Sequence, residues 1–153
     1  METTLVLLKP SCVSRGLIGE IINRFERRGL QIVGMKMMQL DDDKLREHYS
    51  HLVNKPFFPA LAKSMKASPI VAMALQGVEA VTVVRGMTGY TNGRTADPGT
   101  IRGDYSMSNQ QNIVHASDSI DSAEKELARF FKPQEIYPYK HALAEYLYAP
   151  DEY

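Results

Sequence analysis

Apolar residues predominate in four short stretches of the chain, which are bounded by proline, glycine or polar residues. In the first stretch the apolar run from Leu5 to Leu8 is unbroken. Such a run is typical of a strand that is buried on both faces of a sheet, because every side chain then meets an apolar neighbour. The pattern predicts strands in TTLVLLK (3–9), LQIVGMKMM (30–38), PIVAMAL (69–75) and NIVHA (112–116).

Elsewhere, apolar residues recur every three or four positions, which is the period of a helix with one buried face. The clearest case runs from Leu17 to Phe25, and Gly29 is a natural stop after it. The acidic LDDDK at 40–44 favours a helix start, and we expect that helix to reach about Leu52. Further helices are predicted in PFFPALAKSM (56–65), GVEAVTVV (77–84) and SIDSAEKELARFF (119–131), the last capped by Ser119 or Asp121.

Both patterns fail between Arg85 and Gln111, where Gly, Thr, Asn and Asp are frequent. We therefore predict a long loop before the last strand, and a loop of this length in a compact domain is usually functional or disordered. The elements follow the order β-α-β-β-α-β with further helices inserted. This order predicts an α+β sandwich, in which helices pack on a four-stranded antiparallel sheet. At 153 residues, the chain is expected to form one domain, 1–153, with 141–153 as a C-terminal tail.

Charge and composition narrow the classes of partner. Lys plus Arg and Asp plus Glu both number 18, so no global field favours nucleic acid or anionic lipid, and any anion site must be local. Cys12 is the only cysteine, which excludes an internal disulfide and suggests a reducing compartment. The apolar stretch in the N-terminal METTLVLLKP is too short for a signal peptide or a membrane span, and it has no basic flank or cleavage site. We expect a cytoplasmic protein that needs neither a membrane nor nucleic acid.

His115 is the residue whose position raises the sharpest chemical question. It lies at the end of a predicted strand, in NIVHASDS (112–119), where a histidine can be a core residue, a general base, a metal ligand or a nucleophile. The neighbouring loop supplies donors that suit phosphate oxygens, and Lys9 ends the first predicted strand, which can lie beside the last. These loop donors are Arg85, Arg94 and Arg102 with Thr91, Thr95 and Thr100. Alternatively, these side chains lie on the protein surface and contact only solvent.

Two other interpretations of His115 have little support in the sequence. A zinc site needs three or four ligands, but His48, His51 and His141 show no matching ligand spacing with His115. Ser117 lies two residues away and would share a strand face with His115, but the chain lacks the Gly-x-Ser-x-Gly turn of many serine hydrolases. A metal ligand and a hydrolase triad are therefore disfavoured.

Several stretches together resemble the nucleoside diphosphate kinase family, in register from about residue 3 to residue 140. They are NIVHASDS, PGTIRGD (98–104), KPFFPAL (55–61), LVLLKP (5–10) and RGLIGEIINRFERRG (15–29). The resemblance implies a ferredoxin-like fold and transfer of the terminal phosphate from a nucleoside triphosphate to a nucleoside diphosphate. It also implies a phosphohistidine at His115, ping-pong kinetics, broad base specificity and Mg²⁺ held mainly by the nucleotide phosphates, with no metal site made by the protein.

The resemblance further assigns roles to individual residues. Glu126 would hydrogen-bond the imidazole nitrogen of His115 that is not phosphorylated, with Ser119 close to that pair. Tyr49 would lie near Lys9 and position it. Phe57 would stack on the base with Leu61 beside it, although their i, i+4 spacing also suits ordinary helix packing. Phosphates would be bound by Lys9, Arg85, Thr91 and Arg102, and the ribose hydroxyls by Lys9 and Asn112.

The chain departs from the family pattern at three places. Ser11 and Cys12 replace a common Asp-Gly, Gln110 and Gln111 replace Gly-Arg, and Gly93 stands where proline is common. We expect a homo-oligomer, a hexamer or a tetramer as in the family, because the tail HALAEYLYAPDEY carries apolar residues that one domain would leave exposed. Two alternative functions remain, a catalytically silent regulatory or nucleic-acid-binding module and a hydrolase that delivers the phosphate to water.

Overall fold

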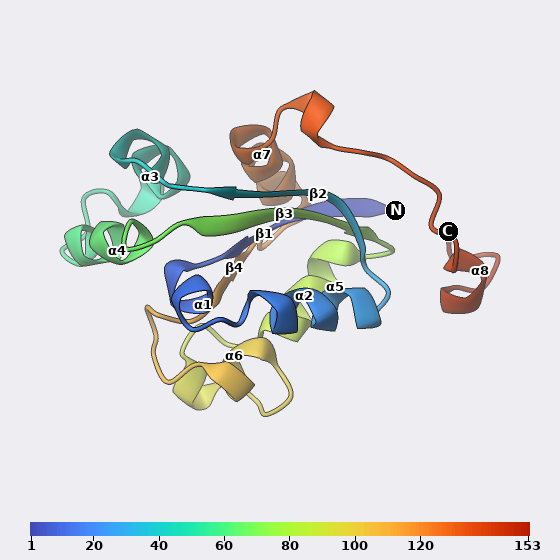
Figure 1. The fold of residues 1–153 in the computed structure, drawn as a ribbon, viewed down its shortest axis with the longest axis horizontal. Coiled ribbons are helices and arrows are strands. Elements are labelled where there is room, and N and C mark those ends of the chain that lie inside the picture. The colour runs from blue at the N-terminus through green and yellow to red at the C-terminus, as the bar shows by residue number, and fades with distance from the viewer.

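The centre of the protein is an antiparallel sheet of four strands, as predicted. The computed structural model describes residues 1–153. Its strands lie in the order β2-β3-β1-β4, the order of a ferredoxin-like fold, and every neighbouring pair is antiparallel (Figure 1). Their bounds are β1 Glu2–Leu8, β2 Gln31–Met38, β3 Ile70–Gly77 and β4 Val114–Ala116.

Helices cover both faces of this sheet, which explains the unbroken apolar runs of the central strands (Figure 1). One face carries α1 (Pro10–Ser14), α2 (Ile18–Arg27), α5 (Ala80–Thr88) and α6 (Ile101–Tyr105). The other face carries α3 (Asp42–His48), α4 (Phe58–Met65) and α7 (Ile120–Phe130). Alternate residues of β1 point to opposite faces of the sheet. Leu5 and Leu7 belong to the core under α3, α4 and α7, while Val6 and Leu8 belong to the core on the other face.

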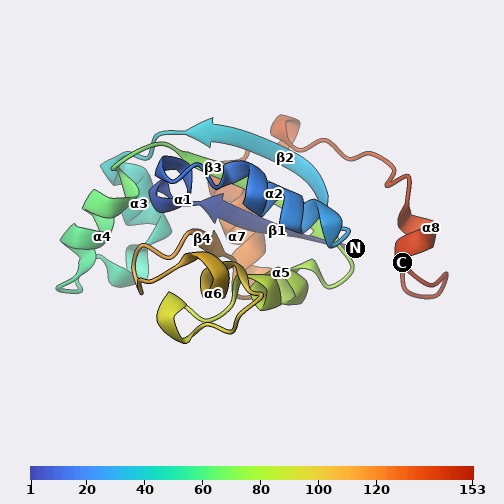
Figure 2. The same ribbon diagram turned by 60° about the horizontal axis from the view of Figure 1, so that its bottom comes forward.

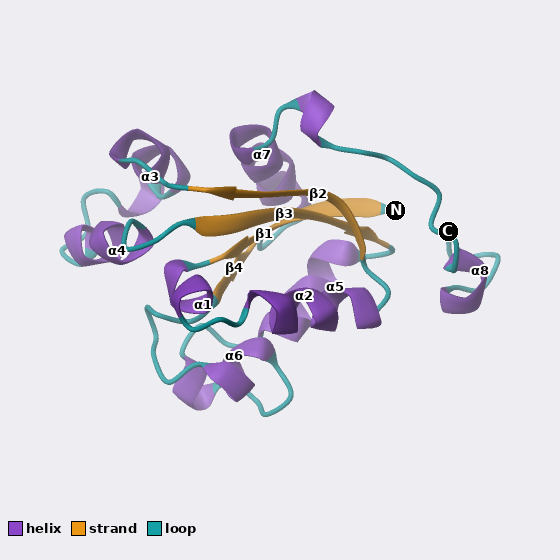
Figure 3. Cartoon of the chain, in the orientation of Figure 1, coloured by secondary structure: helices purple, strands orange, loops and turns teal.

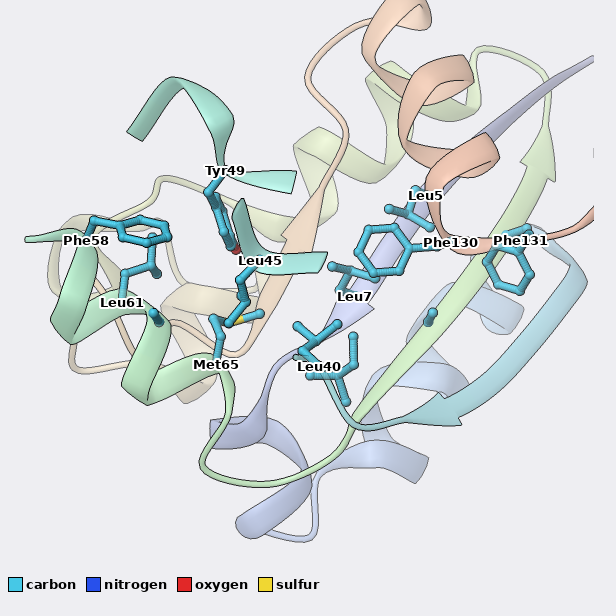
Figure 4. Close-up of a cluster of buried hydrophobic side chains, with 14 of the residues drawn as sticks. Leu5, Leu7, Leu40, Leu45, Tyr49, Phe58, Leu61, Met65, Phe130 and Phe131 are labelled. Atoms are coloured by element: carbon cyan, nitrogen blue, oxygen red, sulfur yellow. The ribbon is translucent and has the colours of Figure 1, made fainter. Parts of the chain in front are cut away.

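The core under α3, α4 and α7 is built largely from leucine and aromatic side chains (Figure 4). Phe130 packs beside Leu5 and Leu7, while Tyr49 and Leu61 lie at the other end, toward α4 (Figure 4). Burying each of these side chains contributes about 1.5 to 3 kcal/mol. This core fixes the ends of α3, α4 and α7 above the sheet, and those ends carry several of the site residues predicted from the sequence.

The structure shows where α3 ends and which residue caps α7, two points on which the sequence was wrong or left a choice. The helix predicted to reach Leu52 ends at His48, because Tyr49 leaves the helical region with φ −105° and ψ 32°, and a separate 3₁₀ turn, η1, follows at Ser50–Leu52. For the last helix, Ser119 is the cap, since its hydroxyl accepts a hydrogen bond from the backbone N–H of Ser122 at 3.1 Å.

The segment predicted as a long loop contains helical structure, so that prediction is partly wrong (Figure 3). Residues 85–88 complete α5, and the 3₁₀ turn η2 (Gly93–Thr95) and α6 follow. Local caps hold these short pieces: Asn92 accepts from the N–H of Arg94, and Thr100 from that of Gly103. A Cβ at position 93 would overlap the carbonyl oxygen of Ser106, which explains why this chain has glycine there.

The last residues extend away from the body of the protein (Figure 2). After the 3₁₀ turn η3 (Pro133–Glu135), the chain ends in α8 (Ala144–Leu147), which returns to lie near Gly29. Several large apolar side chains of this part are exposed, namely Tyr137, Tyr139, Leu143, Tyr146 and Tyr153. None of the helices is both long and apolar enough to cross a membrane.

Candidate active site

A cavity of about 510 Å³ opens where the ends of β1, α3, α4, α5 and β4 meet α7. Its size suits a ligand of nucleotide dimensions. Of the site residues predicted from the sequence, all except Ser119 lie on its wall. They are Lys9, Tyr49, Phe57, Leu61, Arg85, Thr91, Arg102, Asn112, His115 and Glu126.

The centre of the cavity wall is a hydrogen-bonded pair of His115 and Glu126. Val114 and Ala116 face the core under α2 and α5, so His115 between them points to the side of α7. There its Nε2 lies 2.8 Å from Oε2 of Glu126, and the hydroxyl of Ser117 donates to the same oxygen at 2.9 Å. Burial raises the pKa of Glu126, but the hydrogen bonds from His115 and Ser117 outweigh burial and hold this pKa below its usual value.

This pair sets the chemistry of the imidazole. A charged carboxylate only accepts hydrogen bonds, so Nε2 of His115 carries the proton in the neutral ring. The other nitrogen, Nδ1, is then unprotonated and has a free lone pair. A histidine held in this way is equipped for nucleophilic attack.

Ser117, and not Ser119, makes the hydrogen bond to this pair. Ser119 caps α7, and its hydroxyl donates to that of Ser122 at 2.9 Å rather than to His115 or Glu126. Ser117 is fully buried and shares its side of the chain with His115, as two residues on a strand do. The alternation of side chains therefore contained the signal that identifies Ser117.

Lys9 enters the cavity from the end of β1. The pairing of Leu8 with Val114 brings β1 and β4 together, and Nζ of Lys9 lies 2.6 Å from Oδ1 of Asn112 and 3.4 Å from the carbonyl of Gln110. Burial, with Arg102 as a smaller cause, lowers the pKa of Lys9 to about 7. Tyr49 lies on the same cavity wall, but the hydrogen bonds of Lys9 go to Asn112 and Gln110.

Arg102 and Asn112 hold the backbone of the site together. Arg102 is 4% exposed and donates to the carbonyls of Gly89 (2.9 Å), Asn112 (3.3 Å) and Val114 (2.6 Å). The amide of Asn112 donates to the carbonyls of Thr91 and Asn109 at 2.8 and 3.0 Å. Both side chains therefore have structural contacts in addition to the phosphate and ribose contacts predicted for them.

Ile113, between Asn112 and the strand, has a backbone φ of 73°. This value is strained for a β-branched residue, and such strain is retained where the surroundings enforce it. Here its carbonyl accepts from the N–H of Lys9 at 2.9 Å, and its N–H donates to the hydroxyl of Ser11 at 3.3 Å. The departure at Ser11 therefore supplies a contact that supports the strained turn.

The outer part of the cavity carries the more accessible side chains. Arg85 and Thr91 are exposed, and Arg85 makes one long hydrogen bond of 3.4 Å, to the carbonyl of Ala116. Phe57 is 51% exposed, so it is not a core residue, whereas Leu61 is buried in the core behind it. The other loop donors lie outside the cavity, where Arg94 donates to Met107, Thr95 to Asn92 and Thr100 to Asp97.

Sequence reasoning missed several residues of the cavity wall. His48 and Asp118 are the most important, and the others are His51, Leu52, Ala60, Asn109, Gln110 and Ala116. Asp118 is an exposed carboxylate whose pKa is held below its usual value mainly by a hydrogen bond from Ser122. It lies three residues after His115 in the sequence and close to Arg85 in the structure. This closeness to His115 could have identified Asp118 as a site residue.

Two groups on the wall are of a kind that can bind metal ions. Ring nitrogens of His48 and His115 and an oxygen of Glu126 lie within 4.8 Å of one another. However, Glu126 already bonds His115, and Arg129 donates to Nδ1 of His48 at 3.0 Å, so a metal would have to displace these bonds. Mg²⁺ prefers oxygen ligands, for which Asp118 is the available carboxylate.

Comparison with known proteins identifies the family of this chain. The family model described as nucleoside diphosphate kinase matches residues 2–136. The chain is 57% identical, over all 153 residues and the whole of the relative, to a nucleoside diphosphate kinase of Parabacteroides distasonis. It is 50% identical to one of Rhodopirellula baltica, over 99% of this chain and all of that relative.

Solved structures give the same result for the fold. The structure of a halophilic nucleoside diphosphate kinase from Halobacterium salinarum in complex with CDP superposes with a TM-score of 0.94. It is 39% identical, and the match covers 97% of this chain and 99% of that one. The similarity extends along nearly the whole chain in both sequence and structure, and this chain therefore belongs to the nucleoside diphosphate kinase family.

Proposed function

We propose that this chain transfers phosphate through a phosphohistidine formed at Nδ1 of His115, from a nucleoside triphosphate donor to a nucleoside diphosphate acceptor. As a member of the family, the chain is a phosphotransferase that moves a phosphate between nucleotides. The observation that carries this proposal is the 2.8 Å hydrogen bond from Nε2 of His115 to Glu126, which leaves Nδ1 as the nucleophilic nitrogen.

The reaction has two balanced halves. The lone pair of Nδ1 attacks the terminal phosphorus of the donor, the bond to the bridging oxygen breaks, and the donor leaves as a nucleoside diphosphate. A second nucleoside diphosphate then binds, and its terminal oxygen attacks the phosphohistidine, which returns His115 to its starting state. Glu126 stabilises the proton on Nε2 while the ring carries additional positive charge.

The cations of the cavity stabilise the transferred phosphoryl group. Arg85 and Thr91 are exposed and free to turn toward phosphate oxygens, and Lys9 lies deeper, next to Asn112. Arg102 has five N–H groups, and its three bonds to backbone carbonyls leave two of them for a phosphate. Fixed donors of this kind stabilise charge on the equatorial oxygens in the transition state.

Phe57 supplies the stacking surface for the base at the mouth of the cavity. Stacking does not read base edges, so we propose broad base specificity. The relative from Halobacterium salinarum was solved in complex with CDP, which supports nucleoside diphosphates as ligands of this chain. Leu61 belongs to the core and also lines the cavity, and Lys9 and Asn112, on the same wall, would bind the ribose hydroxyls.

Mg²⁺ would bind together with the nucleotide, held mainly by its phosphates. When bound, it neutralises phosphate charge and polarises the terminal phosphorus. Asp118 lies on the cavity wall with its pKa below the usual value, so it is charged at neutral pH and suited to contact the ion directly or through water.

We further propose one domain, 1–153, with 141–153 as a tail, assembled into a hexamer or a tetramer. The exposed tyrosines and leucines of the tail support assembly, and so do Met35 and Met37, which are more than half exposed on the edge strand β2. The prediction of a cytoplasmic protein stays a prediction.

An incubation with ATP, GDP and Mg²⁺ tests the proposed function. The proposal predicts GTP and ADP in equal amounts. Free phosphate in place of GTP would indicate a hydrolase, and unchanged nucleotides would indicate a catalytically silent module. The juxtaposition of Lys9, His115 and Glu126 in one cavity favours transfer over a silent module.

A further inference from the structure

A second histidine is packed against the proposed nucleophile. His48, the last residue of α3, is 6% exposed, and its ring centroid lies 4.6 Å from that of His115, with the two planes at 81°. The rings of Tyr49 and Phe130 hold it on other sides, at 4.6 and 5.1 Å. The imidazole of His48 therefore forms part of the wall that limits rotation of the His115 ring.

Arg129 sets both the orientation and the tautomer of His48. Its Nη1 lies 3.0 Å from Nδ1 of His48, and a guanidinium can only donate, so Nδ1 is the acceptor. The neutral ring then carries its proton on Nε2. Burial, helped by the charges of His115 and Arg129, lowers the pKa of His48 to about 2, so the ring is neutral throughout the physiological range. Glu47 holds Arg129 in turn, with 3.4 Å between Oε1 and Nε.

The Nε2–H of His48 is a buried donor without a partner in the protein. Such groups are rare in folded proteins, and each needs a reason to be retained. A ring nitrogen of His48 lies within 4.8 Å of both a nitrogen of His115 and an oxygen of Glu126. A polar ring atom of His48 therefore lies beside the pair that carries out the chemistry, where a phenylalanine ring would fill the space without polar contacts.

We propose, on the basis of the phosphohistidine route above, that His48 is a positioning residue for phosphoryl transfer. Arg129 holds its imidazole in one rotation and one tautomer, and that imidazole packs edge-on against His115. The contact keeps the His115 ring with Nε2 toward Glu126 and Nδ1 toward the phosphate. The chain Glu47–Arg129–His48–His115 thereby links the outer surface of α3 and α7 to the nucleophile.

The first test is the tautomer of His48, measured by ¹⁵N NMR on histidine-labelled wild-type protein. We expect Nε2–H with an unprotonated Nδ1 at neutral pH, and a mixture of the two tautomers in Arg129→Met. An Nδ1–H tautomer or a charged ring in the wild type would overturn the proposal. This measurement on the wild type does not depend on the folding of any variant.

The second test compares rates of phosphorylation by Mg·ATP in a rapid-quench experiment. His48→Phe keeps a flat ring against His115 but removes the acceptor for Arg129 and the Nε2–H. We expect a rate about tenfold lower, with the apparent affinity for ATP within about twofold, because small errors in orienting the nucleophile slow chemistry rather than binding. His141→Phe, in the tail, is the matched control and should react at the wild-type rate.

The outcomes separate this proposal from the one on which it rests. An unchanged rate in His48→Phe, or a loss only in ATP affinity, would overturn the positioning role and leave the phosphohistidine intact. A wild-type protein that takes no phosphate on His115 would instead overturn the proposed function itself.

Discussion

Nucleotide binding is expected to weaken as the pH rises above 7, because Lys9 must be charged to bind phosphate. Burial and the neighbouring Arg102 lower the pKa of Lys9 to about 7 in the free protein. Bound phosphate favours the ammonium form and raises this pKa again. Binding therefore takes up a proton at pH values above the free pKa, and affinity falls as the pH rises.

The magnitude follows from the fraction of Lys9 that is protonated before binding. With a pKa of about 7, this fraction is about 24% at pH 7.5 and about 3% at pH 8.5. The affinity for GDP should thus fall about eightfold between these two pH values, with uptake of about 0.8 proton per GDP at pH 7.5 and about one at pH 8.5. Arg102, with a pKa lowered to about 10 mainly by burial, stays mostly charged over this range. The terminal phosphate of GDP, with a pKa of about 6, is already ionised.

Isothermal titration calorimetry with Mg·GDP in two buffers of different ionisation enthalpy measures both quantities. Lys9→Gln should bind weakly and equally at the two pH values, while Lys140→Gln, in the segment leading to the tail, should keep the wild-type dependence. Wild-type binding that changes less than twofold between pH 7.5 and 8.5 would show that Lys9 does not titrate on binding in this range. The same eightfold change in Lys9→Gln would also do so, since another group would then be responsible.

Three further predictions follow from the site and the surface. Phe57→Ala should raise the KM of purine and pyrimidine nucleotides by a similar factor, equivalent to about 1 to 3 kcal/mol of stacking, with little change in thermal stability because the side chain is 51% exposed; a loss confined to purines would contradict base-independent stacking. Glu126→Gln should slow phosphorylation of the enzyme by about 10- to 100-fold without preventing it, as measured by rapid quench, since the carboxylate only orients and stabilises the imidazole; a wild-type rate would exclude that role. Light scattering at micromolar concentration should give a multiple of 17.2 kDa, whereas a 17.2 kDa species would disprove assembly.

The strands and long helices could be predicted because their pattern reflects burial that the whole fold imposes. β1 and β3 lie inside the sheet with helices on both faces, so their apolar runs are unbroken, and α2 shows a clear helical period. The sequence does not predict the short helices α1 and α6, because five residues are too few to show a helical period. Their main sequence signals are the residues at their starts, Pro10 and Thr100. Pro10 follows the first predicted strand and is compatible with a strand end, but proline also suits the first turn of a helix, as in α1.

The sequence identifies some residues of the site but not others. The resemblance to the family led to His115 and Glu126, whose contact depends on a strand and a helix that no periodicity places together. The resemblance points to Ser119 near this pair, whereas strand alternation favours Ser117, two positions from His115. His48 could not have been found from local patterns, because its position requires α3 to end early and α7 to supply Arg129.

Labelling the enzyme with γ-³²P-ATP and Mg²⁺ in the absence of an acceptor shows whether His115 carries the phosphate. We expect a label that is labile in acid and stable in base, because a phosphorus–nitrogen bond to imidazole breaks once the ring is protonated. GDP should discharge the label into GTP, and a folded His115→Asn protein should take up no label and show no turnover. An acid-stable label, or turnover by His115→Asn, would exclude a phosphohistidine at His115 and direct attention to the hydroxyl of Ser117.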